Sequence, residues 1–298
     1  MLAIAHEPVT EGRELEGLLE RLARLAGIDR RVVSILDPIE RNVEELNRFR
    51  PDVVMSFGSY LEALFVHLDA SGRAFHHPAA VIHGGDAISA PARRLITETL
   101  GIPVLSLYGS YEAFPLGFEC AQHRGHHMNV DLFPIRLVDS AGEDVSPGES
   151  GEVVISNLLS RGTMLLNYRL GDIARWIPGP CPCGRNLPVL SFVQGRVADW
   201  LTTPAGERLH PQTVTVVLEV DPDVLRYQVV QRQPSRLEIK LVARAGSDLP
   251  AVARRVQTGF ANLLPEIAVD VLFVADLPRT RVGKTRNVVG LEAADSGP

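Results

Sequence analysis

The chain has 298 residues, of which 45% are hydrophobic and 22% are charged, and its formal net charge at pH 7 is −6. These values are typical of a folded globular chain long enough for one large domain or two ordinary ones, and they argue against disorder. Lysine and arginine form no block, which argues against a nucleic-acid-binding face. No apolar run has the length of a membrane span and the chain does not open on a signal peptide, so we expect a cytoplasmic protein.

The first hundred residues alternate between short apolar runs and segments with helical periodicity. The apolar runs predict strands over residues 32–36, 52–57, 79–83 and 103–107. Helices are expected over 15–25, ended by Gly27; after Asp37 as N-cap with Pro38 at the first helical position; over 61–68; and from the N-cap Ser89 to about Leu100. Strands alternating with helices of this length indicate an α/β fold with a doubly wound, mostly parallel sheet.

After residue 133 the pattern changes to strands with little helix between them. Strands over 135–138, 151–156, 164–168 and 173–177, with a turn at 140–144, predict a small antiparallel sheet. Beyond residue 195 a third pattern begins, with strands over 225–231, 237–243 and 269–274 and a helix over 249–264. It indicates a smaller α+β domain of normal size, so we expect two domains, 1–194 and 195–298. The β-branched residues of 213–220 suggest a further strand.

Two glycine-containing loops follow neighbouring predicted strands. In open α/β sheets, ligands bind beyond the carboxyl ends of the strands. One loop holds Gly84, Gly85 and Asp86, and the other begins at Tyr108 and Gly109. Glycine lets the backbone approach a flat ring closely, and a tyrosine offers an aromatic face for stacking. Both loops are therefore candidate nucleotide-binding segments.

Six short motifs occur in a fixed order along the chain. They are Tyr-Gly-Ser-Tyr-Glu at 108–112, Glu-Cys at 119–120, Gly-His-His at 125–127, Tyr-Arg-Leu-Gly-Asp at 168–172, Cys-Pro-Cys-Gly-Arg at 181–185 and the loop that contains Lys284. In this order they resemble the adenylate-forming ligases, specifically the phenylacetate–CoA ligase-like branch. Members of that family join a carboxylic acid to AMP using ATP and pass the acyl group to the thiol of CoA. The resemblance covers the chain from about residue 31 onward and implies a helix, instead of a strand, over 213–220.

The resemblance implies a set of residues that bind ATP and AMP. Tyr108 lies against the adenine, and Asp172 accepts hydrogen bonds from the ribose hydroxyls. Arg196 belongs to a hinge between the family's two domains, in which Ala198 replaces the usual first aspartate. The remaining nucleotide-binding residues are those of the two loops: Gly84, Gly85, Asp86, Gly109 and Ser110.

Activation of a carboxylate requires a cation, Mg²⁺ and hydrogen-bond donors at the α-phosphate of ATP. By the resemblance, Lys284 reaches the carboxylate and the α-phosphate together, and Glu112 holds Mg²⁺. Tyr111 stands where the family usually has a threonine whose hydroxyl reaches the α-phosphate. Lys284 suits its role physically because its ammonium is a compact point charge on a flexible stem.

The chain has three cysteines, and an odd count argues against a secreted disulfide framework. Metal binding and burial as reduced thiols both remain open. Cys120, His127, Cys181 and Cys183 form a Cys₃His set, a common composition for a closed, four-coordinate structural zinc site, and the resemblance implies cysteine and histidine in these motifs. His123 and His126 are competing ligands.

The family's front portion, with its Ser/Thr/Gly-rich phosphate loop, has no counterpart here, and no Gly-x-x-x-x-Gly-Lys replaces it. Three functions stay open. The chain is an acyl–CoA ligase for an aryl or arylacetic acid, dependent on that portion or on a separate chain that supplies it; or it passes the acyl group to an amine or a carrier-protein thiol; or it is a non-catalytic homologue that binds nucleotide, acyl-adenylate or a partner chain. Tyr111 and Ala198 favour the last, and the Lys284 loop favours an enzyme. A homodimer would cover apolar sheet surface that the missing portion exposes.

Overall fold

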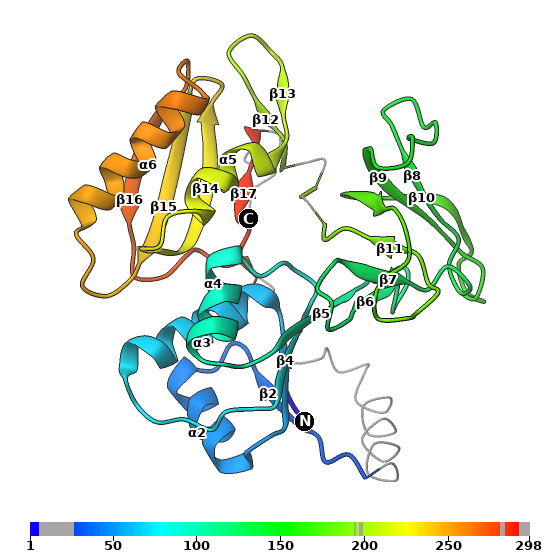
Figure 1. Cartoon of the computed structure of the whole chain (residues 1–298), viewed down its shortest axis with the longest axis horizontal. Coiled ribbons are helices and arrows are strands. Elements are labelled where there is room, and N and C mark those ends of the chain that lie inside the picture. The colour runs from blue at the N-terminus through cyan, green and yellow to red at the C-terminus, as the bar shows by residue number, and fades with distance from the viewer. Residues whose placement is uncertain (6–26, 194, 197–198, 281–283, 292–298) are drawn as a thin grey trace. The chain divides into compact units, whose positions relative to one another are not determined.

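The computed structural model describes residues 1–5, 27–193, 195–196, 199–280 and 284–291. The chain forms two compact units. The first comprises Met1–Val104 and Pro278–Thr285, and the second comprises Leu105–Leu277 and Arg286–Pro298 (Figure 1). Each unit is described by itself below. The helix expected over 15–25 and the hinge residue Ala198 lie outside the described residues, and the domain boundary at residue 195 stays a prediction.

The first unit contains a parallel sheet. Its strands, in spatial order, are β2 (Arg31–Ser34), β1 (Leu2–Ala5), β3 (Val53–Ser56) and β4 (Ala80–Gly84), and the pairs β1–β2, β1–β3 and β3–β4 are all parallel. The predictions of β2, β3 and β4 are confirmed. β1 was missed because a run of four residues at the start of the chain is too short to show a strand pattern. The parallel sheet places the ends of β3 and β4, and the loops that follow them, at one edge.

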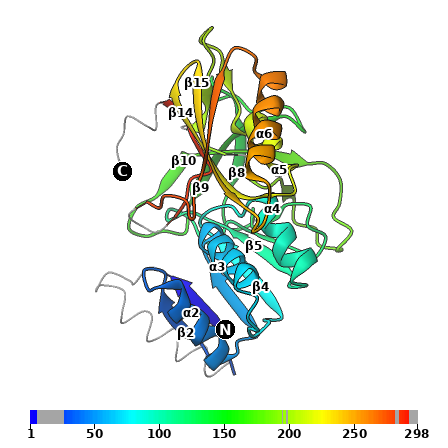
Figure 2. The ribbon, with the colours of Figure 1, turned by 90° about the vertical axis from the view of Figure 1, so that its left-hand side faces the viewer.

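Helices on one face of these strands form the core of the first unit (Figures 1 and 2). They are α2 (Ile39–Phe49), α3 (Gly58–Ser71), α4 (Ala90–Arg94) and the π-helix η2 (Leu95–Thr99). The core joins residues of α2, α3 and η2 to the strands, among them Leu46, Leu64, Phe65 and Ile96. The closeness of this packing is visible at Gly58, where a Cβ would lie 2.6 Å from the backbone of Ala87.

The caps of these helices follow the sequence in one case and depart from it in another. Ser89 is the N-cap of α4, and its hydroxyl accepts from the amide of Ala92, as expected. The prediction that Asp37 caps α2 was wrong. Pro38 is the N-cap with an extended ψ of 141°, so the helix begins one residue later and Asp37 pairs with Arg41 at 3.1 Å.

The second unit begins with antiparallel strands. β5 (Val104–Tyr108) pairs with β6 (Gly117–Glu119), which pairs with β7 (His126–Met128). β11 (Val189–Leu190) pairs with β7 on one side and with β10 (Leu165–Ile177) on the other. β10 pairs in turn with β9 (Ser150–Asn157), and β9 pairs with β8 (Ile135–Val138). The two strands expected over 164–168 and 173–177 are one strand of 13 residues, because β10 passes through two irregularities without leaving the sheet. Asp172 lies within the second irregularity, between Arg169 and Ile173, and its carboxylate accepts a hydrogen bond from Tyr108 of β5.

The C-terminal lobe of the second unit is an α+β layer. Its sheet has the order β16 (Ala268–Phe273), β15 (Arg236–Ala243), β14 (Val224–Gln233) and β17 (Val288–Val289). Helices α5 (Pro211–Glu219) and α6 (Leu249–Leu263) pack against it, and a hairpin of β12 (Leu201–Thr202) and β13 (Arg208–Leu209) precedes them. Residues 213–220 therefore form most of a helix, not a strand. Val214 and Leu218, four residues apart, both lie in the core, so tertiary packing outweighs the β propensity of this segment.

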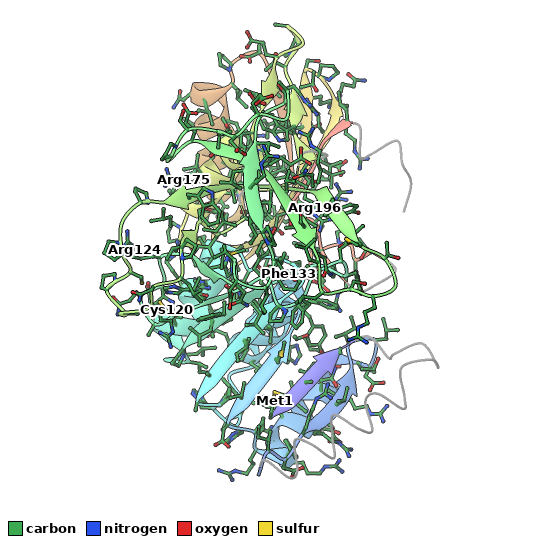
Figure 3. All side chains as sticks on the ribbon, turned by 90° about the vertical axis from the view of Figure 1, so that its right-hand side faces the viewer. Met1, Cys120, Arg124, Phe133, Arg175 and Arg196 are labelled. Carbon is green, nitrogen blue, oxygen red and sulfur yellow. The ribbon has the colours of Figure 1, made fainter. Side chains whose placement is uncertain are left out.

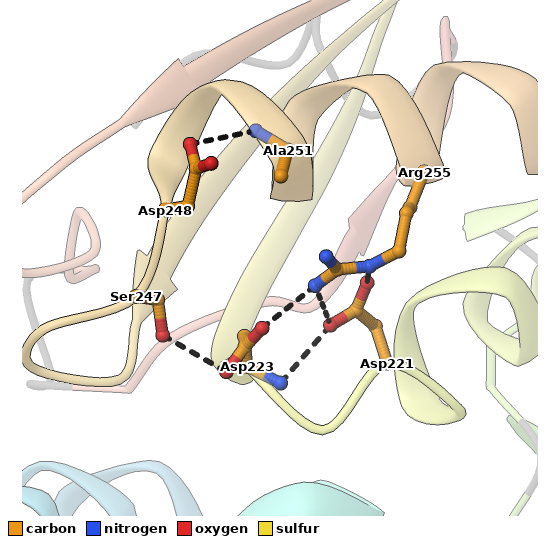
Figure 4. Close-up of polar contacts among 6 residues, drawn as sticks. All are labelled: Asp221, Asp223, Ser247, Asp248, Ala251 and Arg255. Atoms are coloured by element: carbon orange, nitrogen blue, oxygen red, sulfur yellow. Dashed lines mark hydrogen bonds and ion pairs between the residues drawn. The ribbon is translucent and has the colours of Figure 1, made fainter.

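A polar network fixes α6 to the turn between α5 and β14 (Figure 4). The guanidinium of Arg255 donates to both carboxylate oxygens of Asp221, at 2.8 and 2.9 Å, and to Asp223 at 2.7 Å. Ser247 donates to Asp223, and Asp248 caps α6 at the amide of Ala251. The hydrogen bonds from Arg255 lower the pKa of Asp221, so this carboxylate stays ionised in its pair with Arg255.

Together the parallel sheet, the antiparallel strands and the C-terminal α+β lobe confirm the predicted fold class. Among the described residues, no helix is both long enough and apolar enough to cross a bilayer.

Candidate nucleotide site and metal cluster

Asp172 lies at the centre of a cluster that also contains Tyr108 and Arg196, which we call the aspartate cluster. Asp172 and Tyr108 are buried, and the side chain of Arg196 is exposed. The hydroxyl of Tyr108, the last residue of β5, donates to Oδ2 of Asp172 at 2.9 Å. Nε of Arg196 donates to Oδ1 at 3.1 Å. The backbone holds this arrangement, because Ile173 donates from its amide to the carbonyl of Gly195. The sequence motifs at 108–112, 168–172 and 195–196 thus meet at one carboxylate.

The environment of Asp172 opposes its ionisation and is compensated by neighbours. Only 8% of the residue is exposed, and this burial raises its pKa, while the charge of Arg196 and the hydrogen bond from Tyr108 lower it. Burial also raises the pKa of Tyr108 well above its usual value, followed by the charge of Asp172, so the phenol stays a donor. The ring of Tyr108 lies in the hydrophobic core of this region, so its hydroxyl is the part that the cluster uses.

Glu112 lies in the middle of the loop 109–116, which connects β5 to β6. Oε1 of Glu112 accepts from the hydroxyl of Tyr168 at 3.0 Å, and its backbone carbonyl accepts from the amide of Asn157 at 2.6 Å. The Glu112 amide, and after it Ser110 and Tyr168, lower the pKa of the carboxyl, which is therefore ionised at neutral pH. An ionised, partly exposed carboxylate is the kind of oxygen ligand that Mg²⁺ takes. Tyr111, next to it, is fully exposed.

The backbone of this loop is tightly packed at its first residue. A Cβ at Gly109 would lie 2.4 Å from the ring of Phe114, so a side chain there would displace the ring. The amide of Ala113 donates to both the carbonyl and the hydroxyl of Ser110, which closes the loop as a turn. The sequence analysis did not identify Asn157 as a partner of Glu112. Its hydrogen bond forms only because β9 ends beside this loop.

In the first unit, Lys284 lies against the loop that follows β4, in what we call the lysine cluster. Its ammonium donates to the carbonyl of Gly85 at 2.9 Å and lies 4.7 Å from the ring centroid of Phe57. The structure therefore brings together Lys284 and the segment 84–86, which are about 200 positions apart in the sequence. Asp86 accepts from the hydroxyl of Ser59 at 2.6 Å; burial raises its pKa, while Ser59 and then Lys284 lower it.

The sequence-predicted nucleotide residues thus fall into two groups. Lys284, Gly84, Gly85 and Asp86 belong to the first unit. Tyr108, Gly109, Ser110, Glu112, Asp172 and Arg196 belong to the second. The sequence analysis did not identify Phe57 and Ser59 as neighbours of Lys284. A glycine–serine pair at the start of a helix is common, and it does not indicate contact with a loop so distant along the chain.

The four predicted metal ligands gather in one place in the second unit. One ligand atom from each of Cys120, His127, Cys181 and Cys183 lies within 4.8 Å of all the others. The sulfurs of Cys120 and Cys181 are 3.7 Å apart, and Sγ of Cys183 is 3.3 Å from Nε2 of His127. Two thiolates on a tetrahedral zinc with bonds of about 2.3 Å are roughly 3.8 Å apart. The donor set and its spacing fit a zinc ion.

The surroundings of the metal cluster orient its ligands. Nδ1 of His127 lies 3.3 Å from the carbonyl of Leu187, so a proton on Nδ1 leaves Nε2 free to ligate. The competing histidines are engaged elsewhere, since Nδ1 of His123 lies 2.7 Å from Glu119 and Nε2 of His126 lies 2.7 Å from the hydroxyl of Ser106.

The two halves of the metal cluster are also joined by the protein itself. The guanidinium of Arg124 donates to the carbonyl of Pro180 at 3.1 Å, and Cys120 and Arg124 lie near each other at one edge of this region (Figure 3). The amide and then the side chain of Arg185 lower the pKa of Cys183 to about 6, which favours its thiolate.

Comparisons with known proteins show what the chain as a whole is similar to. No protein-family model matches the chain. The phenylacetate–coenzyme A ligase of Pseudomonas putida is 29% identical over 168 residues, which are 54% of this chain and 38% of the ligase. That of Escherichia coli strain K12 is 27% identical over 276 residues, or 84% of this chain and 62% of the ligase. A solved structure of 2-hydroxyisobutyryl-CoA ligase in complex with R3-HIB-AMP has a TM-score of 0.77 at 19% identity, covering 97% of this chain and 65% of that one.

In sequence the chain is similar to the phenylacetate–CoA ligases, and its fold is similar to that of the 2-hydroxyisobutyryl-CoA ligase. This phenylacetate–CoA ligase-like chain spans about 40 to 60% of the length of the two ligases named above. The activity of those ligases is therefore only a proposal for this chain.

Proposed function

We propose that this chain supplies the nucleotide-binding and lysine-bearing part of an AMP-forming acid–thiol ligase, which activates an aryl or arylacetic acid as its acyl-adenylate. The observation that carries the proposal is the lysine cluster, in which a loop from the far end of the sequence presents an ammonium at the Gly85 carbonyl. The aspartate cluster and Glu112 give independent support, because each offers a group that an adenylate requires.

The use of lysine in this chain supports the role of Lys284. The sequence has 28 arginines and only two lysines, Lys240 and Lys284. Positive side-chain charge is thus carried almost entirely by arginine. The other lysine, Lys240, forms an ordinary ion pair with Glu238 at 3.4 Å. A compact ammonium reaches a phosphate and a carboxylate together, which the broad guanidinium fork does less well. The need to reach a phosphate and a carboxylate together therefore explains why position 284 is a lysine in a chain that otherwise uses arginine.

In the proposed reaction the acid oxygen attacks the α-phosphorus of ATP, forming the acyl–phosphate bond and releasing pyrophosphate. Lys284 neutralises charge that builds on the carboxylate and the α-phosphate. Asp172 accepts from the ribose hydroxyls, with Tyr108 and Arg196 fixing its orientation. Bound Mg²⁺, for which Glu112 is the proposed ligand, would add positive charge at the phosphates. Gly84, Gly85, Gly109 and Ser110 contribute backbone close to the nucleotide.

The acceptor of the acyl group is proposed from the relatives. Phenylacetate–coenzyme A ligases are among the proteins that this chain resembles, which favours CoA as the thiol over a carrier protein or an amine. Tyr111 favours a second candidate, a homologue that binds nucleotide or acyl-adenylate without catalysis. Its side chain is fully exposed where the family has a short hydroxyl residue. A separate chain that supplies a phosphate loop, and a homodimer, stay predictions.

Zinc is the proposed occupant of the metal cluster, in a structural role. Four protein ligands complete a tetrahedron and leave no position for a substrate. Three cysteines that form no disulfide fit a reducing compartment, which is the support for the proposed cytoplasmic location.

Calorimetric titration with a non-hydrolysable aryl acyl-adenylate analogue tests the function. We expect the wild-type chain to bind the analogue, and Lys284→Ala to weaken binding at least tenfold because a charge contact with the phosphate is lost. Lys240→Ala is the matched control, since it removes the other lysine, and should leave the affinity unchanged. Absence of binding by the wild type, or equal affinities for all three proteins, would contradict the proposal. Binding of the analogue with no turnover of ATP, acid and CoA, even when a separate chain supplies the phosphate loop, would favour the non-catalytic homologue.

A further inference from the structure

Ser59, the second residue of α3, has a buried hydroxyl that both accepts and donates a hydrogen bond. Its Oγ accepts from the amide of Thr285 at 3.1 Å and donates to Oδ2 of Asp86 at 2.6 Å. The amide of Ser59 donates to the other oxygen of Asp86 at 3.3 Å. Only 3% of the residue is exposed. One buried hydroxyl therefore links the loop after β4 to the segment that carries Lys284.

The bond to Thr285 fixes the backbone next to Lys284. On the other side, the carbonyl of Lys284 accepts from the amide of Thr280 at 2.8 Å, and the amide of Lys284 donates to the hydroxyl of Thr280 at 3.2 Å. The lysine backbone is thus held by its own loop and by Ser59. Since a lysine side chain has four rotatable bonds, its charged end is positioned only when its backbone is fixed.

The charged end of Lys284 is held by the same part of α3. Phe57, the N-cap of α3, places its ring under the ammonium while Gly85 accepts the hydrogen bond. A Cβ at Gly85 would lie 2.9 Å from the Phe57 ring and 3.3 Å from the ammonium, and the φ of Gly85 is +79°, so glycine is required there. Arg279, from the same loop, lies over the ring of Tyr60.

We propose that Ser59 is a positioning residue that sets the location of Lys284, through the amide of Thr285 and the carboxylate of Asp86. This rests on the proposed function of Lys284. Ser59 itself contacts no reacting atom. Loss of its hydroxyl leaves the Thr285 amide without its buried acceptor and Oδ2 of Asp86 without its donor, so the loop separates from α3 and takes Lys284 with it.

Lysine labelling tests the proposal in the full chain. Pulse labelling with an N-hydroxysuccinimide ester, quantified by mass spectrometry of peptides, reports Lys284 against Lys240 as the internal reference in the same molecule. We expect Ser59→Ala to raise the ratio of labelling at Lys284 to that at Lys240 at least threefold. Ser59→Thr, which keeps the hydroxyl, should stay near the wild-type ratio. Ser71→Ala is the matched control, because Ser71 lies at the other end of α3 and donates only to Leu68.

An unchanged ratio in Ser59→Ala would overturn the proposal, and so would an equal rise at both lysines, since that indicates general loosening of the fold. Hydrogen exchange of the wild-type Thr285 amide adds a measurement that needs no variant: protection is expected, and rapid exchange would overturn the proposal even if Ser59→Ala did not fold. Failure of the wild type to bind the acyl-adenylate analogue would overturn the proposed function, while the labelling ratio would still decide what positions Lys284.

Discussion

A carboxylate that must accept from a ribose has to be ionised, and the aspartate cluster shows what this demands of a buried residue. Both oxygens of Asp172 already have donors, Tyr108 and Arg196. Each carboxylate oxygen has two lone pairs, so both can accept a further bond from a sugar hydroxyl. We therefore propose that Tyr108 acts on a bound nucleotide through Asp172.

Replacement of Tyr108 by phenylalanine should weaken nucleotide binding in a pH-dependent manner. Burial already raises the pKa of Asp172, and the hydrogen bond from Tyr108 lowers it, so Tyr108→Phe raises it further. Because binding needs the ionised form, affinity for the acyl-adenylate analogue should fall as pH drops through this raised pKa. In Tyr108→Phe the fall should occur at higher pH, with affinity about threefold to tenfold lower near neutrality, measured by calorimetry between pH 5 and 8.

Tyr227→Phe controls for the loss of a buried phenol in general. Tyr227 is also buried and donates to a carboxylate, Glu219, in the C-terminal lobe. Each variant should lose about 1 to 3 kcal/mol of unfolding free energy, but Tyr227→Phe should keep the wild-type affinity profile. Identical pH profiles for Tyr108→Phe and the wild type would contradict the role of Tyr108.

How far single residues could be predicted depended on whether their partners were near in sequence. Asp172, Glu112 and Lys284 lie in motifs whose order predicted a role in nucleotide binding or catalysis. Asn157 and Ser59 carry no such motif, and their partners are 45 and 226 positions away. Contacts of that kind arise only from the fold, so no local pattern could have predicted them.

At the scale of elements, periodicity predicted most strands and helices, and it failed where packing opposed propensity. The segment 213–220 has the β-branched residues of a strand, yet α5 forms because Val214 and Leu218 reach the same core. Gly259 of α6 allows this helix pair to approach, since a Cβ there would lie 2.6 Å from Val217. The resemblance to a family implied the helix, and composition alone did not.

The metal cluster joins the turn between β6 and β7 to the loop before β11, so removal of the metal should lower the stability of the fold. Cys120 and His127 flank the turn from β6 to β7, and Cys181 and Cys183 belong to the loop before β11. The hydrophobic contacts around them are few. We expect about one zinc per chain by plasma mass spectrometry, and a fall in melting temperature of several degrees on chelation at neutral pH.

Cys181→Ser should bind zinc more weakly and melt below the wild type before any chelator is added. Ser191→Ala is a control on the neighbouring strand end, where the hydroxyl donates to Phe192 and lies outside the cluster; its zinc content should stay at the wild-type value. Protein purified without chelator and found to contain no zinc would refute the proposed occupant.

At the scale of the whole molecule, the path of the chain decides which residues come to lie near Lys284. The segment Pro278–Thr285 leaves the C-terminal lobe and belongs to the first unit, after which Arg286 returns to the second. Both turning points are anchored by ion pairs, Arg226 with Asp276 and Arg286 with Asp199. Motif order could predict that Lys284 was important, but the unit to which its loop belongs follows from contacts about 200 positions apart.

The last prediction concerns catalysis by the chain as it stands. Pyrophosphate carries several negative charges, and enzymes that release it from ATP hold it with clustered backbone N–H groups and cations. The sequence contains no glycine-rich phosphate loop of that kind, and the chain spans 62% of the Escherichia coli phenylacetate–coenzyme A ligase that it matches. We therefore expect the isolated chain to bind the acyl-adenylate analogue but to exchange pyrophosphate into ATP at most slowly, with the complete Escherichia coli ligase as the positive control. Robust, acid-dependent exchange by the isolated chain would show that its own residues hold the outer phosphates, and would shift the search for those residues to the loops around Lys284 and Glu112.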